Sequence, residues 1–117
     1  MPLDNLFNEG YDDLVAGLSQ ATGLTIVDDP RNINPPCILL QAPSFRMHSN
    51  VVAEMQFSLT VIGVGPGNRN ALVSLLSLAD QIREAQLGLM EGRPVIQTVG
   101  GAEYPAYELT LSTKVAP

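Results

Sequence analysis

The stretch Glu54–Leu87 constrains the fold most, because two different hydrophobic periods follow one another in it. Apolar and polar residues alternate from Met55 to Val61, which predicts a β-strand over Met55–Val64 with one face in a core. After a turn at Gly65–Gly67, an amphipathic helix is predicted over about Asn68–Leu87. Its apolar positions are Leu72, Leu75, Leu76, Ala79 and Ile82. We expect the strand and the helix to pack together, because each large buried side chain contributes roughly 1.5–3 kcal/mol.

The rest of the chain predicts a second helix and four more strands. The helix near the N-terminus ends at Thr22-Gly23, and its apolar residues are Phe7, Tyr11, Leu14, Val15 and Leu18. The strands are Leu24–Val27, Cys37–Gln41, Pro94–Val99 and Ala106–Val115. The last two flank Gly100-Gly101 and are typical of a hairpin. We expect a loop at Asp28–Pro36, a loop or hairpin arm at Pro43–Val51, and a connection at Leu89–Arg93.

These elements follow the order α-β-β-β-α-β-β, which indicates an α+β fold. A length of 117 residues suits one domain over residues 1–117. We expect a mixed or antiparallel sheet of about five strands. Both helices should cover one face of the sheet, because the strands alternate rather than being apolar throughout.

The net charge of −6 argues against a nucleic-acid-binding surface, because such binding depends on Lys and Arg neutralising phosphates. An acidic balance is equally typical of an ordinary soluble protein. The single cysteine, Cys37, has no partner for an internal disulfide, and its apolar neighbours predict a small buried side chain. No stretch has the length and apolarity of a membrane span or a secretory core, so we expect assembly in a cytoplasm.

The segment Gly63–Asn68 joins a strand to a helix, and free amides at a helix N-terminus can bind phosphate. It lacks the Gly-x-Gly-x-x-Gly spacing, and no Lys-Ser/Thr pair follows its last glycine. The sequence therefore favours a plain turn with Asn68 as N-cap over a nucleotide site.

Other chemistry-bearing residues form no recognisable catalytic or metal-binding set. His48 has no second histidine as a partner ligand, and a Cys37–His48 nucleophile pair has no local support. The acidic pairs Asp12-Asp13 and Asp28-Asp29 fit a solvated helix face and turn chemistry. We expect neither a metal nor a cofactor nor an enzyme, but an interaction module whose strand edges and loops meet a partner.

Three runs of the chain carry a resemblance to a known family: Thr25–Leu40, Val61–Leu72 and Tyr107–Thr113. Their most specific parts are Asp-Pro-Arg-Asn-x-Asn-Pro-Pro-Cys, ending at Cys37, and Gly-Pro-Gly-Asn, ending at Asn68. The chain resembles the tail-terminator proteins of long-tailed phages (siphoviruses) of actinobacteria from about Leu14 to Val115. The resemblance implies a small α+β domain without a cofactor.

The resemblance also implies a structural role in the virion. Such a protein forms a ring, commonly of six copies, at the head-proximal end of the tail tube after assembly in the host cytoplasm. It contacts the tail tube protein, ends tube growth, and presents a surface to the neck or head–tail connector protein. DNA passes through the lumen without sequence-specific binding, and no membrane is involved. Alternatives are another head–tail connector, such as a neck adaptor or head-closure protein, or a small-ligand-binding α+β domain; an enzyme comes last.

We expect the ring or tube contacts in two segments, Asp28–Asn34 and Pro43–Asn50. The residues singled out there are Asp28, Asp29, Arg31, Asn32, Phe45, Arg46, Met47 and His48. Two simpler interpretations remain open. Phe45 and Met47 could alternate inward from an extended strand, and Arg31 could pair with Asp28 or Asp29, an exposed contact worth about 0–1 kcal/mol.

Overall fold

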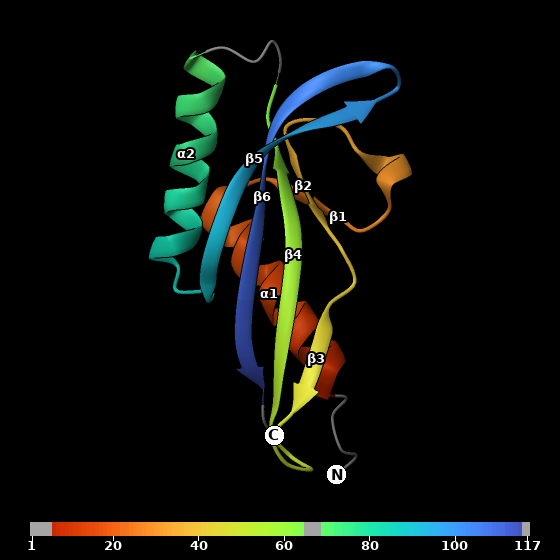
Figure 1. Cartoon of the computed structure of the whole chain (residues 1–117), viewed down its shortest axis with the longest axis vertical. Coiled ribbons are helices and arrows are strands. Elements are labelled where there is room, and N and C mark those ends of the chain that lie inside the picture. Colours follow the sequence, from red (N-terminus) through yellow and green to blue (C-terminus); the bar gives the residue numbers. More distant parts are fainter. Residues whose placement is uncertain (1–5, 65–68, 116–117) are drawn as a thin grey trace.

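The computed structural model describes residues 6–64 and 69–115 and forms a single compact α+β domain (Figure 1). The predicted Gly65–Gly67 turn and Asn68 cap lie outside these residues. The helices are α1 (Leu6–Thr22) and α2 (Arg69–Glu84), with a short 3-10 helix, η1, at Pro30–Asn32. The strands are β1 (Thr25–Val27), β2 (Cys37–Leu40), β3 (Ser44–Met47), β4 (Ala53–Ile62), β5 (Leu89–Val99) and β6 (Ala102–Val115).

The strands form one mixed sheet in the order β1-β2-β4-β6-β5, with β3 also paired to β4. Only β1 and β2 are parallel; the other neighbours are antiparallel. Over the described residues the sheet has six strands, five of them in the main order and β3 beside it, and the chain order is α-β-β-β-β-α-β-β. Of the two alternatives for Pro43–Val51, the hairpin arm is correct, because β3 pairs with β4 there.

Strands β2 and β3 run along the same side of β4. Leu40 lies opposite Leu59 and Ser44 lies opposite Gln56, so the β2–β3 side holds one more residue than β4 over this interval. The result is one bent strand, interrupted by a bulge-like segment before Ser44. Because β1 covers only the β2 part, the outer side of β3 is left as a sheet edge.

The prediction of a connection at Leu89–Arg93 is wrong, because β5 already begins at Leu89 and pairs with β6 from there. Gly92 and Pro94 lower the strand propensity of this segment. Both are tolerated because β5 is an edge strand with only one neighbour. The Gly100-Gly101 hairpin is confirmed, and both glycines have positive φ.

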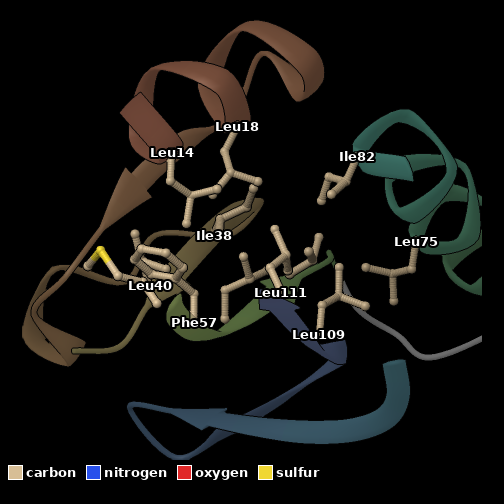
Figure 2. Packing of buried hydrophobic residues seen from close by; sticks show 12 residues of the cluster. Leu14, Leu18, Ile38, Leu40, Phe57, Leu75, Ile82, Leu109 and Leu111 are labelled. Carbon is tan, nitrogen blue, oxygen red and sulfur yellow. The ribbon is translucent and has the colours of Figure 1, made fainter. Parts of the chain in front are cut away.

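The main core lies between the sheet and both helices, as Figure 2 shows. The prediction that both helices cover one face is therefore confirmed. The buried members of this core come from α1, α2 and the central strands: Leu14, Leu18, Ile38, Leu40, Met55, Phe57, Leu59, Val61, Leu75, Ile82, Leu109 and Leu111.

A smaller cluster lies on the opposite face of the sheet. Its buried residues are Cys37, Leu39, Ile62 and Ala106, and partly buried neighbours include Ile33, Val95 and Tyr104. The predicted burial of Cys37 is confirmed. The loop around η1 and the β5–β6 hairpin supply the covering side chains, so this end of the sheet is covered on both faces.

Candidate interaction surfaces

The predicted contact loop Asp28–Asn34 is organised by one local ion pair. The Asp29 carboxylate caps η1 by accepting a hydrogen bond from the Arg31 backbone N–H at 2.9 Å. It also binds the Arg31 guanidinium, with 2.8 Å between Oδ2 and Nη2. Hydrogen bonds from the Arg31 side chain and backbone hold the pKa of Asp29 below its ordinary value. Of the two partners considered for Arg31, Asp29 is therefore the one it contacts, while Asp28 and Asn32 are exposed.

The second predicted segment forms β3 and displays apolar side chains. Phe45 lies opposite the buried Met55, and Met47 lies opposite Ala53, so both point to the helix-covered face. Phe45 contacts Phe7 of α1 with ring centroids 4.4 Å apart. Even so, Phe45 is 58% exposed and Met47 is 44% exposed. Both side chains thus point inward, as the alternation considered from the sequence proposed, but the helices do not bury them.

Arg46 and His48 belong to a polar set on the other face of the sheet. Arg46, Glu54 and Lys114 lie opposite one another on β3, β4 and β6. His48 Nε2 lies 3.1 Å from Glu54 Oε1, and Ser112 Oγ donates a hydrogen bond to Glu54 Oε2 at 2.8 Å. The hydrogen bonds from Ser112, first, and from His48 lower the pKa of Glu54. His48 therefore helps to fix the β3–β4 hairpin.

The structure does not bring the two predicted segments together. The domain is elongated, with extents of 49 × 28 × 22 Å. In Figure 1, β3 lies near the lower end, whereas the η1 loop lies beside the β5–β6 hairpin in the upper half. The eight residues singled out from the sequence therefore belong to two separate surfaces.

Sequence reasoning missed an apolar surface on α2. Leu72 and Leu76 were expected in the core, but they are 43% and 48% exposed, and Val73 is exposed too. The buried residues of α2 are Leu75 and Ile82, with Leu78 and Ala79 partly buried against the same core, so the buried stripe is narrower than the apolar stripe. A signal was present: four of the five residues from Leu72 to Leu76 are apolar, more than one buried helix face can hold.

This α2 surface borders a groove beside the β5–β6 hairpin. The groove has a volume of about 720 Å³ and is lined mainly by apolar residues, including Leu72, Pro94, Ile96 and Tyr107, with Arg69 and Glu103 at its polar positions. Ile96 is 68% exposed. We call Leu72, Val73, Leu76 and Ile96 the α2 apolar surface.

The helix-free face of the sheet is polar below the small Cys37 cluster. Along β3, β4, β6 and β5 it presents Ser44, Gln56, Ser58, Thr110 and Ser112 together with Arg46, Glu54, Glu91, Arg93, Glu108 and Lys114. Acidic and basic residues are equal in number among those described here. Arg93 pairs with Glu108 at 2.8 Å.

The remaining chemistry-bearing residues form no shared site. Asp12 and Asp13 are exposed on α1, in agreement with a solvated helix face. Within residues 6–64 and 69–115, no group of His, Cys, Asp and Glu is arranged to hold a metal ion. In the same ranges, neither helix has the length and apolarity needed to cross a membrane.

A scan against protein-family models finds no model that matches this chain, and a search of the curated proteins finds no similar sequence. The functional conclusion therefore rests on the residues, their geometry and the sequence resemblance described above.

Proposed function

We propose that this chain is a structural virion protein, a tail terminator that forms a ring at the head-proximal end of a long phage tail. In this role it ends polymerisation of the tail tube and joins the tube to the neck while DNA passes through. It binds no cofactor and catalyses no reaction. The resemblance of Thr25–Leu40, Val61–Leu72 and Tyr107–Thr113 supports this proposal, and the α+β fold agrees with what the resemblance implies.

The structural observation that carries the proposal is the presence of two separate apolar surfaces on one small domain. Phe45 and Met47 are exposed on β3, and the α2 apolar surface lies on the same face of the sheet but beside β5 and β6, toward the opposite edge. Exposed apolar surfaces of this kind mark protein–protein contacts. Two different surfaces on one chain allow head-to-tail contacts between identical copies, which close into a ring when the rotation permits.

The polar sheet face supports the second part of the proposal, the passage of DNA. Its acidic and basic residues are balanced, and Arg93 is already paired with Glu108. A surface that neutralises few phosphates releases few counterions and so binds DNA weakly. Such a face suits the wall of a channel through which a polyanion slides.

The test is to add the purified chain to tail tube protein while the tube polymerises. We expect shorter tubes, each with a ring at one end in electron micrographs, and no effect from an unrelated acidic protein of similar size. In images of the whole phage particle, a ring between the tube and the head that does not contact the tube would indicate a neck adaptor or head-closure protein instead. Tubes of unchanged length without an end ring would contradict the proposal.

A further inference from the structure

The two free edges of the sheet are suited to each other. Strand β5 has a neighbour only on its β6 side, and among the described residues β3 pairs only with β4. Across β5, β6, β4 and β3 every pair is antiparallel, so β3 and β5 run in opposite directions. When this four-strand unit is repeated side by side, β3 of one copy meets β5 of the next in antiparallel orientation. An exposed edge strand is a template for such pairing.

The register of this pairing follows from the side chains. Through β4, the residues of β3 lie at the same height along the sheet as Ser112–Val115 of β6, whereas β5 begins opposite Leu111 of β6. The two edges therefore overlap only when the next copy is shifted along the strand direction. A shift of four residues brings Ser44, Phe45 and Arg46 beside Arg93, Gly92 and Glu91, and Met47 then meets β5 at the irregularity between Leu89 and Glu91. An even shift keeps the faces aligned, because side chains alternate with a period of two.

With this shift, the facing residues are complementary on both faces. Arg46 lies opposite Glu91 on the polar face; within the described ranges neither forms an ion pair shorter than 4.0 Å, and the charge of Arg46 acts within its own copy on Glu54. Phe45 lies opposite Gly92 on the helix face, where the Leu109 side chain fills the space beside Gly92 and offers an apolar surface to the ring; an aromatic residue beside an edge glycine is a known stabilising pair. A shift of six residues would instead place Arg46 opposite Arg93, which like charges disfavour.

The paired segment also has a natural end. Opposite Ser44 stands Arg93, and the next residue of β5 is Pro94, which has no N–H to donate. On the copy that supplies β3, the strand that continues this edge along β4 is β2. The outer side of β2 is already paired with β1. In Figure 1, β5 and β6 curve away from the main sheet beyond this point. The contact is therefore confined to Leu89–Arg93 of one copy and Ser44–Met47 of the other.

The same shift is compatible with a closed ring. Four residues correspond to roughly 13 Å along the strands for every roughly 19 Å across four strands. The resulting tilt is about 35°, at the lower end of the 35–45° found in closed barrels. An edge-to-edge contact with this stagger can thus return to its starting level after one turn.

We propose that Ser44–Met47 of one copy adds as a strand to Leu89–Arg93 of the next, with Arg46 facing Glu91. This inference rests on the proposed function, since it assumes self-assembly, and it names the surfaces that make the ring. It also accounts for the exposure of Phe45, whose ring would extend from the joined sheet toward the uncovered side of the neighbouring copy's α2.

The test is disulfide trapping in the intact chain with Arg46→Cys and Glu91→Cys combined. Under mild oxidation we expect a ladder of cross-linked multimers on non-reducing gels, ending at the ring size, because the two positions face each other between copies. Each single variant should give no ladder; the buried Cys37 is common to all variants. The pair Arg46→Cys with Arg93→Cys, on the same face but two residues along β5, should cross-link several-fold less.

Absence of the ladder would overturn the inference, as would equal trapping by the Arg93→Cys pair. A dimer formed by Glu91→Cys alone would also overturn it, since β5 would then pair with β5. Measuring the mass of the assembled, unmodified chain in solution, together with the tube assay, tells the two proposals apart. A ring without the cross-link leaves the proposed function standing and removes the edge contact. A chain that cross-links but leaves tail tubes unterminated keeps the contact and removes the function.

Discussion

Phe45 of β3 stacks on Phe7 of α1 with ring centroids 4.4 Å apart, yet more than half of the Phe45 side chain is exposed. Phe7 covers one side of the Phe45 ring, at the end of the sheet where β3 lies beside α1. The outer side of the Phe45 ring is therefore free for a partner. This arrangement makes β3 both a part of the fold and a candidate contact strand.

Replacing Phe45 and Met47 together with Ser should leave the domain folded and abolish ring formation. The loss of the Phe7 contact should cost about 0.5–1.5 kcal/mol beyond the lost buried area. Circular dichroism melting measures the stability, and light scattering measures the mass. As a matched control, Phe57→Ala in the core should cost about 3–5 kcal/mol. If the Ser variant unfolds as the control does, these residues belong to the core and the interface claim is wrong.

Leu75 and Leu76 are adjacent in α2 but differ in burial, so they provide a matched pair. Leu75→Ala should destabilise the domain by about 2–5 kcal/mol, because Leu75 lies in the main core. Leu76→Ala should change stability by no more than about 0.5 kcal/mol, as expected for an exposed position. Denaturant unfolding measures both values. Equal losses would mean that the α2 apolar surface is part of the core.

The pH dependence of stability should reflect Glu54. Its pKa is lowered from the ordinary value of 4.5 by hydrogen bonds from Ser112 and His48. A carboxylate with a lowered pKa in the folded state stabilises the fold above its unfolded pKa, and this contribution is lost as the pH falls through the folded pKa. Glu54→Gln should therefore flatten the decline of the melting temperature below about pH 4.5. An unchanged decline would show that Glu54 makes no such contribution.

Nucleotides and inorganic phosphate should leave the melting temperature unchanged. A ligand at 100 times its dissociation constant would stabilise the fold by about 2.7 kcal/mol, a shift that thermal melting detects easily. A clear shift with any member of a nucleotide panel would favour the small-ligand-binding alternative. The panel should include phosphate alone, because the segment Gly63–Asn68 before α2 was the candidate phosphate-binding site in the sequence.

The sequence predicted those parts of the fold in which a single buried face sets the pattern. The alternation in β4 and the helical spacing in α1 both placed their apolar residues correctly, and Gly23 ends α1 with positive φ as expected. Edge elements were harder to predict. Strand β5 contains Gly92 and Pro94, and nothing local shows that an edge position tolerates both.

The candidate surfaces were predicted in part. Local composition indicated that Phe45 and Met47 have no full place in the core, and both are exposed on β3; their role in a contact stays a prediction. The α2 apolar surface was not predicted, because Leu72 and Leu76 fit a helical stripe as well as Leu75 does. Which of these leucines is covered depends on how α2 lies on the sheet, and that is set by contacts between segments far apart in the sequence.

An image of the assembled phage particle at side-chain resolution tests the central claim most directly. We predict a ring of this chain at the head-proximal end of the tail tube, with Ser44–Met47 of each copy beside Leu89–Arg93 of its neighbour. A particle in which this chain is absent, or lies apart from the tail, would contradict the account.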